Sequence, residues 1–331
     1  MNLFLQKNML KKLLIFLLII APVFASAQYK NSKKRNSVRT GSSFTKRKKP
    51  RPEFIIGVGA SNFLGELGGA NQIGTFFVRD LEFKATRPST QIAIRYKFSK
   101  RFAVKGGYYY QLLSGNDKLT KEPFRNNRNL HFRSSIHEVS GQFEFFFTKE
   151  QQGARYNIKN AKGMKNYNFQ AYGFVGVGGI YFNPQAKYRG AWVNLQPLGT
   201  EGQGLVDGPK KYSRFTFVIP YGIGVKNAID KEWSVGLEVG IRKTFSDYID
   251  DVSGVYYDND ALRAARGDMA ADLADPSLLN MPEALGGNSI GGIQSAKGEV
   301  RGHSNHKDAY MFLNVTISYK IPAKRRTRSK F

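Results

Sequence analysis

Residues 232–242 read Glu-Trp-Ser-Val-Gly-Leu-Glu-Val-Gly-Ile-Arg, and their character alternates at every position. One face carries the large apolar side chains of Trp233, Val235, Leu237, Val239 and Ile241. The other face carries Glu232, Ser234, Gly236, Glu238, Gly240 and Arg242. Because successive side chains of an extended chain point to opposite faces, this stretch predicts a β-strand with one apolar face. A soluble sandwich buries such a face in its core, whereas a membrane barrel turns it toward lipid.

The same alternation returns along the chain and predicts eight strands between Glu53 and Ile321. They lie at about residues 53–61, 90–99, 101–113, 136–147, 168–182, 214–226, 232–242 and 309–320. Most are longer than the usual strand of about 5–6 residues, and tilted strands of about 9–11 residues cross a bilayer. The fifth strand is rich in glycine, so the sequence does not decide which of its side chains face inward. Pro220 predicts an edge or a bulge in the sixth, because proline donates no ladder hydrogen bond.

The lengths of the connections alternate between short and long. Short links occur at Lys100 and at 227–231, and long ones at 63–89, 114–135, 183–213 and 246–308. Only the 148–167 link departs from this alternation. Short periplasmic turns and long external loops are typical of outer-membrane barrels. An even number of strands would place both basic tails on the periplasmic side.

The polar faces of the predicted strands mix both charge signs with glycine. The residues expected to point inward and form a network are Arg95, Lys97, Lys105, Glu138, Glu144, Glu238 and Arg242. Eight strands leave an interior that side chains just fill. We therefore expect an all-β, eight-stranded antiparallel transmembrane β-barrel with a plugged interior and no pore. Aromatic girdles are expected near the strand ends, at 108–110, 145–147, Tyr181, Phe182, Trp233 and Tyr319. A secreted soluble β-sandwich is the alternative.

The N-terminus has the pattern of a secretory signal peptide. Lys7, Lys11 and Lys12 precede an apolar run at 13–24, and Ala25-Ser26-Ala27 follows it. The run is too short for an ordinary membrane-spanning helix, so we expect residues 1–27 to be removed after export. An uncleaved N-terminal anchor is the alternative.

The chain carries 51 lysines and arginines against 25 acidic residues, a formal net charge of +26. Much of this excess lies in residues 28–52 and 322–331, which flank the predicted barrel at 53–321 and should be disordered when free. The candidate partner-contacting residues are Lys46, Arg47, Lys48, Lys49, Arg51, Lys324, Arg325 and Arg326. Such tails are compatible with solvation alone, with anionic lipid headgroups or with an acidic periplasmic partner. Because we expect the chain to be exported, nucleic acid is disfavoured as a binding partner of these tails.

Few residues suggest catalysis or metal binding. The absence of cysteine excludes disulfides and thiol chemistry. His137-Glu138 is compatible with a base and its carboxylate, but no nucleophile can be placed beside them. His303, His306 and Asp308 could ligate a metal, although a solvated loop is the simpler reading. The acidic run Asp247, Asp250, Asp251, Asp258 and Asp260 lacks the spacing of a calcium loop. We expect an ordered external lid there, with a short helix within 261–285, and neither enzymatic activity nor a cofactor.

Three segments carry a resemblance to a known family. They are Gly57-Val-Gly-Ala-Ser-Asn-Phe-Leu-Gly-Glu-Leu-Gly-Gly69, Arg79-Asp-Leu-Glu-Phe83 and Thr244-Phe-Ser-Asp-Tyr-Ile-Asp-Asp-Val-Ser-Gly254. The chain resembles, over about residues 53–321, the PorG family of Bacteroidota outer-membrane barrels, which serve type IX secretion and gliding. The resemblance implies a non-enzymatic barrel in the cell outer membrane, surrounded by its lipids, that contacts periplasmic ring proteins of that machinery. Alternatives are a structural or adhesive surface barrel and, less favoured, a lipid-modifying barrel enzyme.

Overall fold

The computed structural model describes residues 51–65, 67, 85–119, 123–148, 169–230, 232–277, 297–302 and 307–322. The chain divides into two units, 1–48 and 49–331, and only the second contains described residues. The predicted signal peptide and most of the basic N-terminal segment therefore lie outside the described residues. So do the last nine residues of the C-terminal tail.

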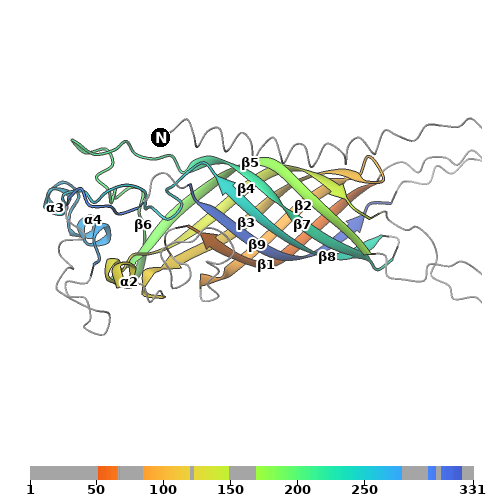
Figure 1. Cartoon of the computed structure of the whole chain (residues 1–331), viewed down its shortest axis with the longest axis horizontal. Coiled ribbons are helices and arrows are strands. Elements are labelled where there is room, and N and C mark those ends of the chain that lie inside the picture. The colour runs from red at the N-terminus through yellow and green to blue at the C-terminus, as the bar shows by residue number, and fades with distance from the viewer. Residues whose placement is uncertain are drawn as a thin grey trace, which may run out of the picture. The chain divides into compact units, whose positions relative to one another are not determined.

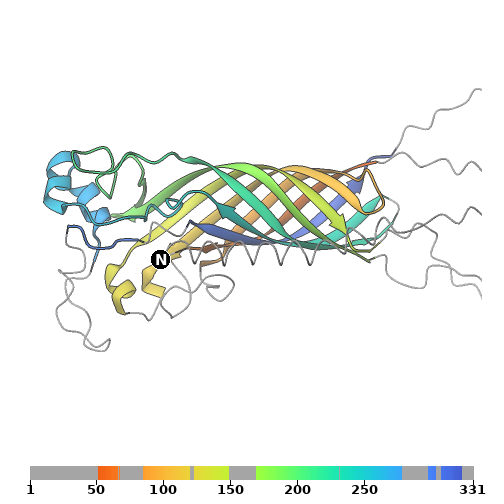
Figure 2. The same ribbon diagram turned by 45° about the horizontal axis from the view of Figure 1, so that its top comes forward.

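Eight long strands form a closed antiparallel barrel, which confirms the predicted fold (Figures 1 and 2). They are β1 (Pro52–Leu64), β2 (Arg87–Tyr96), β3 (Phe102–Asn116), β4 (His131–Phe146), β5 (Phe169–Tyr188), β7 (Phe215–Ala228), β8 (Trp233–Thr244) and β9 (Ala309–Lys320). Each pairs with its neighbours in the chain, and β1 pairs with β9 to close the ring. The fifth strand runs six residues beyond its predicted end, and a ninth strand, β6 (Ala191–Asn194), pairs with that extension inside a connection predicted to be a loop.

The outer face of the barrel is apolar along every strand. Val139, Val177 and Ile223 are 66%, 72% and 64% exposed, values that a water-soluble sheet would avoid for a continuous set of aliphatic side chains. In β8, Trp233, Val235 and Leu237 are exposed while Ser234, Glu238 and Arg242 are buried. The apolar face of the 232–242 stretch is thus the outer face, and the barrel encloses its polar face.

Pro220 lies in a fully enclosed strand, so the predicted edge or bulge was wrong. It pairs with Arg242 of β8 on one side. On the other side the ladder between β5 and β7 is interrupted, because Val175 pairs with Tyr221 and pairing resumes only at Gly178 with Val218. The register is the same on both sides of this gap. The missing proline N–H is therefore accommodated by local loss of ladder pairing without an inserted residue.

The two ends of the barrel differ. At the end that we call the loop end, the connections carry α2 (Pro123–Arg128), β6, α3 (Asn259–Arg266) and α4 (Asp268–Ala274) (Figure 1). At the opposite, terminal end, β1 begins, β9 ends, and short links at 97–101 and 229–232 join neighbouring strands. Long external loops and short periplasmic turns are typical of outer-membrane barrels, so we expect the loop end to face outward. None of the described helices is long and apolar enough to cross a membrane.

Aromatic side chains divide between the two faces of the wall. Trp233 and Tyr319 pack outside at the terminal end, with ring centroids 4.8 Å apart. Tyr108, Tyr110 and Tyr181 surround His137 outside, nearer the loop end. Tyr109, Phe146 and Phe182, which were assigned to the girdles, are instead fully buried inside, because each lies one residue out of phase with its outward-facing neighbours.

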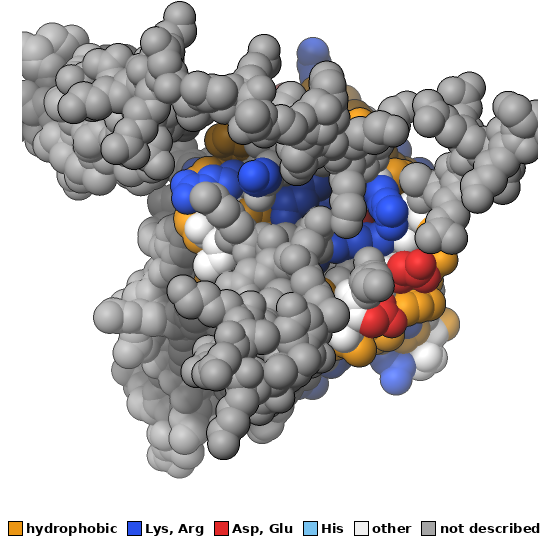
Figure 3. Space-filling model, turned by 90° about the vertical axis from the view of Figure 1, so that its right-hand side faces the viewer, with side chains coloured by type: hydrophobic (Ala, Val, Ile, Leu, Met, Phe, Trp, Pro, Cys, Tyr) orange, Lys and Arg blue, Asp and Glu red, His pale blue; other side chains and the backbone are white. Residues whose placement is uncertain are grey.

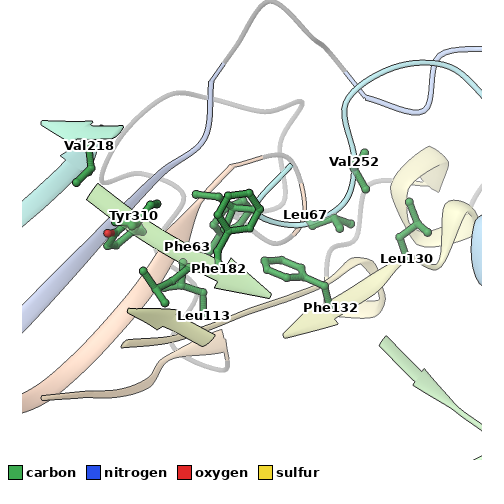
Figure 4. Packing of buried hydrophobic residues seen from close by; sticks show 12 residues of the cluster. Phe63, Leu67, Leu113, Leu130, Phe132, Phe182, Val218, Val252 and Tyr310 are labelled. Atoms are coloured by element: carbon green, nitrogen blue, oxygen red, sulfur yellow. The ribbon is translucent and has the colours of Figure 1, made fainter. Parts of the chain in front are cut away.

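A cluster of apolar side chains fills the loop end of the barrel (Figure 4). Phe63 of β1 and Phe132 of β4 meet there edge to face, with centroids 4.9 Å apart. Ile249 and Val252, from the connection between β8 and β9, pack against the same cluster. This apolar layer separates the charged barrel interior from the external connections.

Candidate functional site

The barrel interior contains a network of buried ion pairs, which begins near the terminal end. The Lys226 ammonium lies 2.6 Å from the Glu53 carboxylate. Arg95 lies 3.3 Å from the same carboxylate and binds Glu144 through two N–H groups. Because β1, β2, β4 and β7 contribute one member each, the network ties distant parts of the wall together.

A second group of ion pairs continues this network further inside. The Lys105 ammonium lies 2.8 and 2.7 Å from the two carboxylate oxygens of Glu238. The Tyr172 hydroxyl donates a 2.9 Å hydrogen bond to Glu238. Lys105 is also 3.5 Å from Glu144, which joins the two groups.

A third group lies below the apolar layer. Arg242 donates from Nε to Glu138 at 3.0 Å, and Ser140 and Tyr310 donate to the same carboxylate. The Arg242 guanidinium lies 4.2 Å from the ring centroid of Phe312. Its two Nη atoms have no hydrogen-bond partner among the described residues, so the aromatic faces supply part of its surroundings.

The charges of the interior balance. The buried ionic residues of the described barrel strands are Arg95, Lys105, Lys226 and Arg242, and Glu53, Glu138, Glu144 and Glu238. Four positive and four negative side chains therefore share a low-dielectric interior, where an unpaired charge would be strongly unfavourable. The arrangement is a neutral plug held by side chains from every part of the wall.

Six of the seven residues predicted for the interior lie in this plug. The seventh, Lys97, follows the end of β2 and lies at the edge of the plug. The residue is half-buried, but its ammonium is buried and lies 3.8 Å from the ring centroid of the inward-facing Phe146. Sequence reasoning missed Glu53, Lys226, Tyr172 and Tyr310. The alternation of β7 contained a usable signal, because Phe215, Phe217 and Ile223 face outward and the same period places Lys226 inside.

The external connections form an ordered lid that contains its own buried charges. Arg301 donates to the Glu201 carboxylate at 2.9 Å and to the Asp251 carbonyl at 2.6 Å. The Asp251 carboxylate accepts hydrogen bonds from the hydroxyls of Thr200 and Tyr212. We call the residues around Arg301, namely 200–201, 247–254 and 301–302, the lid cluster. The predicted ordered lid is present in this part of the chain, and α3 and α4 occupy much of the region predicted to contain a short helix.

The lid cluster should close more firmly as the pH falls. Burial raises the pKa of Asp251 to about 6; Glu201 adds to this rise, whereas Arg301, Thr200 and Tyr212 oppose it. An exposed aspartate has a pKa of about 3.9, so the closed lid binds this proton more tightly than an opened lid does. Closure therefore gains about 2 kcal/mol between pH 7 and pH 4. Hydrogen exchange at Val252–Gly254, corrected for intrinsic rates, should slow over this range. Asp251→Asn should remove the pH dependence of this exchange. If the exchange of the variant changed with pH as much as that of the wild-type protein, another group would be responsible.

The geometry does not assemble the catalytic pair considered above. His137 points outward and its Nδ1 lies 2.7 Å from the Tyr108 hydroxyl. Glu138 points inward to Arg242, because neighbouring residues of a strand face opposite sides. His303 and His306 lie outside the described residues, and Asp308 accepts a 2.9 Å hydrogen bond from the Ile249 N–H.

Four of the five carboxylates in the acidic run of the lid accept hydrogen bonds within the protein. Asp247 accepts from the Ser253 hydroxyl at 2.7 Å, Asp250 from the Val252 N–H at 3.0 Å, and Asp258 from the Ala261 N–H at the start of α3. Within the described ranges, no group of three acidic or histidine side chains has the arrangement of a metal site.

The terminal end of the barrel gathers basic side chains around its mouth (Figure 3). Arg51, Lys100 and Arg101 are exposed there, and Lys97 and Lys320 are half-buried. Asp230 and Glu232 add two acidic residues in the link between β7 and β8. Of the predicted partner-contacting residues only Arg51 is described; Lys46–Lys49 and Lys324–Arg326 lie outside the described residues.

A closed ring of strands, an apolar exterior and a neutral ionic plug define a transmembrane β-barrel of the outer-membrane type. Residues 43–183 match a family model described as Domain of unknown function (DUF6089). No curated protein sequence matches the chain.

Solved structures of similar fold come from several bacteria. One is Ail, the attachment invasion locus protein of Yersinia pestis, which was solved with the heparin analogue sucrose octasulfate. Its TM-score is 0.34 at 9% identity, and the match covers 82% of this chain and 99% of Ail. Neisserial surface protein A has a TM-score of 0.34 and 7% identity, with 81% and 97% covered. OprG, an outer membrane protein of Pseudomonas aeruginosa, has a TM-score of 0.29 and 8% identity, with 83% and 98% covered.

Proposed function

We propose that this protein is a non-enzymatic outer-membrane barrel that acts as a membrane anchor or accessory component of the type IX secretion and gliding machinery. The observation that carries the proposal is the contrast between its sealed interior and its basic terminal end. The ionic plug and the apolar layer above it occupy the barrel interior, which favours a role that does not depend on transport through it. A function at the periplasmic face must then use the rim of the barrel and the tails that continue from it.

The basic rim favours a partner with an acidic surface. Arg51, Lys100 and Arg101 are exposed at the mouth, and the tails on either side of the barrel add many more positive charges. Such a distribution speeds and orients association with an acidic protein. Two of the three family-like segments include described residues in β1 and the lid cluster, while Arg79–Phe83 lies outside the described residues.

Gene deletion tests this role. Loss of the gene should abolish secretion of type IX cargo and gliding, and re-expression should restore both. A complementing variant with glutamine at Lys46–Lys49, Arg51 and Lys324–Arg326 should co-purify with less of the periplasmic ring proteins, whereas Lys210→Gln/Lys211→Gln, at the opposite end, should not change their recovery. Normal secretion and motility in the deletion strain would refute the role.

A structural or adhesive role at the cell surface is the second candidate. It is favoured by the ordered lid, on which Val206 and Val300 are 83% and 58% exposed. Pull-down from solubilised membranes separates the two functions. Recovery of no ring protein, together with surface binding that is lost when Val206 and Val300 are changed to serine, would favour adhesion.

A further inference from the structure

The outer wall carries an organised row of amide side chains just beyond the lipid-facing surface at the loop end. Asn183 donates from Nδ2 to the Asn194 side-chain oxygen at 2.9 Å. Gln185 donates from Nε2 to the same oxygen at 2.7 Å. The row crosses the β5–β6 hairpin, which extends beyond the barrel at its loop end (Figure 1).

Two arginines are held at either side of this row. Arg133 of β4 donates from Nε to the Gln185 side-chain oxygen at 2.9 Å, and its guanidinium lies 4.0 Å from the Trp192 ring centroid. Arg214, just before β7, donates to the Asn183 side-chain oxygen at 3.3 Å and lies 5.3 Å from the Tyr181 ring centroid. We call these seven residues the arginine–amide cluster.

The cluster contains two positive charges and no negative one. Neither Arg133 nor Arg214 forms an ion pair with any described residue, whereas Arg95, Arg242 and Arg301 each pair with a carboxylate. Amide oxygens and aromatic faces orient a guanidinium but do not neutralise it. Both side chains are only half-buried, and most of their N–H donors stay available to an external acceptor.

The position of the cluster indicates what kind of hydrogen-bond acceptor its arginine N–H groups would meet. Arg214 directly precedes β7, whose first outward-facing residues, Phe215 and Phe217, are 55% and 67% exposed on the lipid-facing wall. Arg133 lies four residues from His137 along β4, roughly 13 Å of strand, on the same outer face. Cationic side chains at the edge of an apolar belt meet the headgroups of the surrounding lipid.

We propose that the arginine–amide cluster binds the phosphate-bearing headgroup of a lipid in the external leaflet. Arginine suits this ligand because its planar N–H groups match phosphate oxygens in pairs. The amide row holds both guanidinium groups in place before the lipid arrives, so binding requires little ordering of side chains. A soluble polyanion would share the charge but not the contact with the apolar belt.

Native mass spectrometry of the full-length protein tests this site, with lipid A as the probe and the same lipid without its phosphates as the comparison. The wild-type protein should retain lipid A preferentially. Arg133→Gln/Arg214→Gln should reduce its retention roughly 30-fold, whereas Lys243→Gln, which removes an exposed outward lysine of β8 at the same end, should leave it within about twofold. A heat-modifiable band from each variant confirms that the barrel has folded.

The remaining arms separate the possible sources of the phosphate group. Inorganic phosphate at millimolar concentration should not displace lipid A, since the lipid also contacts the apolar wall. Displacement by inorganic phosphate would overturn the lipid proposal in favour of an anion site. Equal retention by the double variant and the wild-type protein, equal binding of the two lipid forms, or tighter binding of a sulfated oligosaccharide than of lipid A would each refute it.

Discussion

Glu238→Gln should lower the free energy of unfolding by about 3–5 kcal/mol, because it leaves the Lys105 ammonium buried without its main counter-charge. Both side chains are fully enclosed, and both oxygens of Glu238 contact the ammonium. Glu144, 3.5 Å from the Lys105 ammonium, compensates only in part, since it also binds Arg95 through two N–H groups. The change in urea-unfolding midpoint of the barrel refolded in lipid vesicles measures the loss.

An exposed ion pair provides the control for this prediction. Arg263 lies 2.6 Å from Asp268, a separation close to that of Lys105 and Glu238, but the two side chains are 42% and 71% exposed. Arg263→Gln should therefore change the unfolding free energy by less than about 1 kcal/mol. Lys105→Met combined with Glu238→Gln should recover more than half of the Glu238→Gln loss, because neither member then carries an unpaired charge. Equal losses in Glu238→Gln and Arg263→Gln would contradict the proposed role of burial.

Alternation predicted the wall of this barrel well because facing depends on a local rule. The face assignment of 232–242 needed no knowledge of distant contacts, and neither did the alternating lengths of the connections. The extension of β5 and the existence of β6 depend on pairing between 185–188 and 191–194 around Gly190, whose φ of 92° suits a tight turn. A short strand pair of this kind differs little in free energy from an ordinary loop, so composition alone could not show that β6 would form.

The partners within the plug were less accessible to prediction. Alternation places Lys105 and Glu238 inside, yet their contact joins residues 133 positions apart and depends on the shear of the closed barrel. Glu53 was passed over because it is the second residue of β1, where a polar side chain more often marks a strand end. The arginine–amide cluster was missed for a similar reason. Arg133 and Arg214 bind Gln185 and Asn183, which lie in the part of β5 beyond its predicted end.

The lid cluster should depend on a single arginine in the same way that the plug depends on its ion pairs. Arg301→Met would leave the Glu201 carboxylate buried, with the Ser253 and Gly254 N–H groups as its remaining donors at 2.9 and 3.2 Å. Removing the charge that neutralises a buried carboxylate costs about 3–5 kcal/mol. The change also removes the hydrogen bond to the Asp251 carbonyl, so two of the segments that Arg301 joins would separate.

This loss should open the lid while the barrel stays folded, because the plug and the strand ladders share no side chain with Arg301. Hydrogen exchange at Ser253 and Gly254 should accelerate by roughly a hundredfold or more, since local opening governs exchange there. Exchange in β8 and the heat-modifiable band should not change. Lys297→Met, which removes an exposed lysine 4.0 Å from Asp258, supplies the matched control and should leave the lid closed. Loss of the heat-modifiable band in Arg301→Met would contradict this prediction. It would mean that the lid and the barrel unfold together as one cooperative unit, because the lid could not open without unfolding the strands.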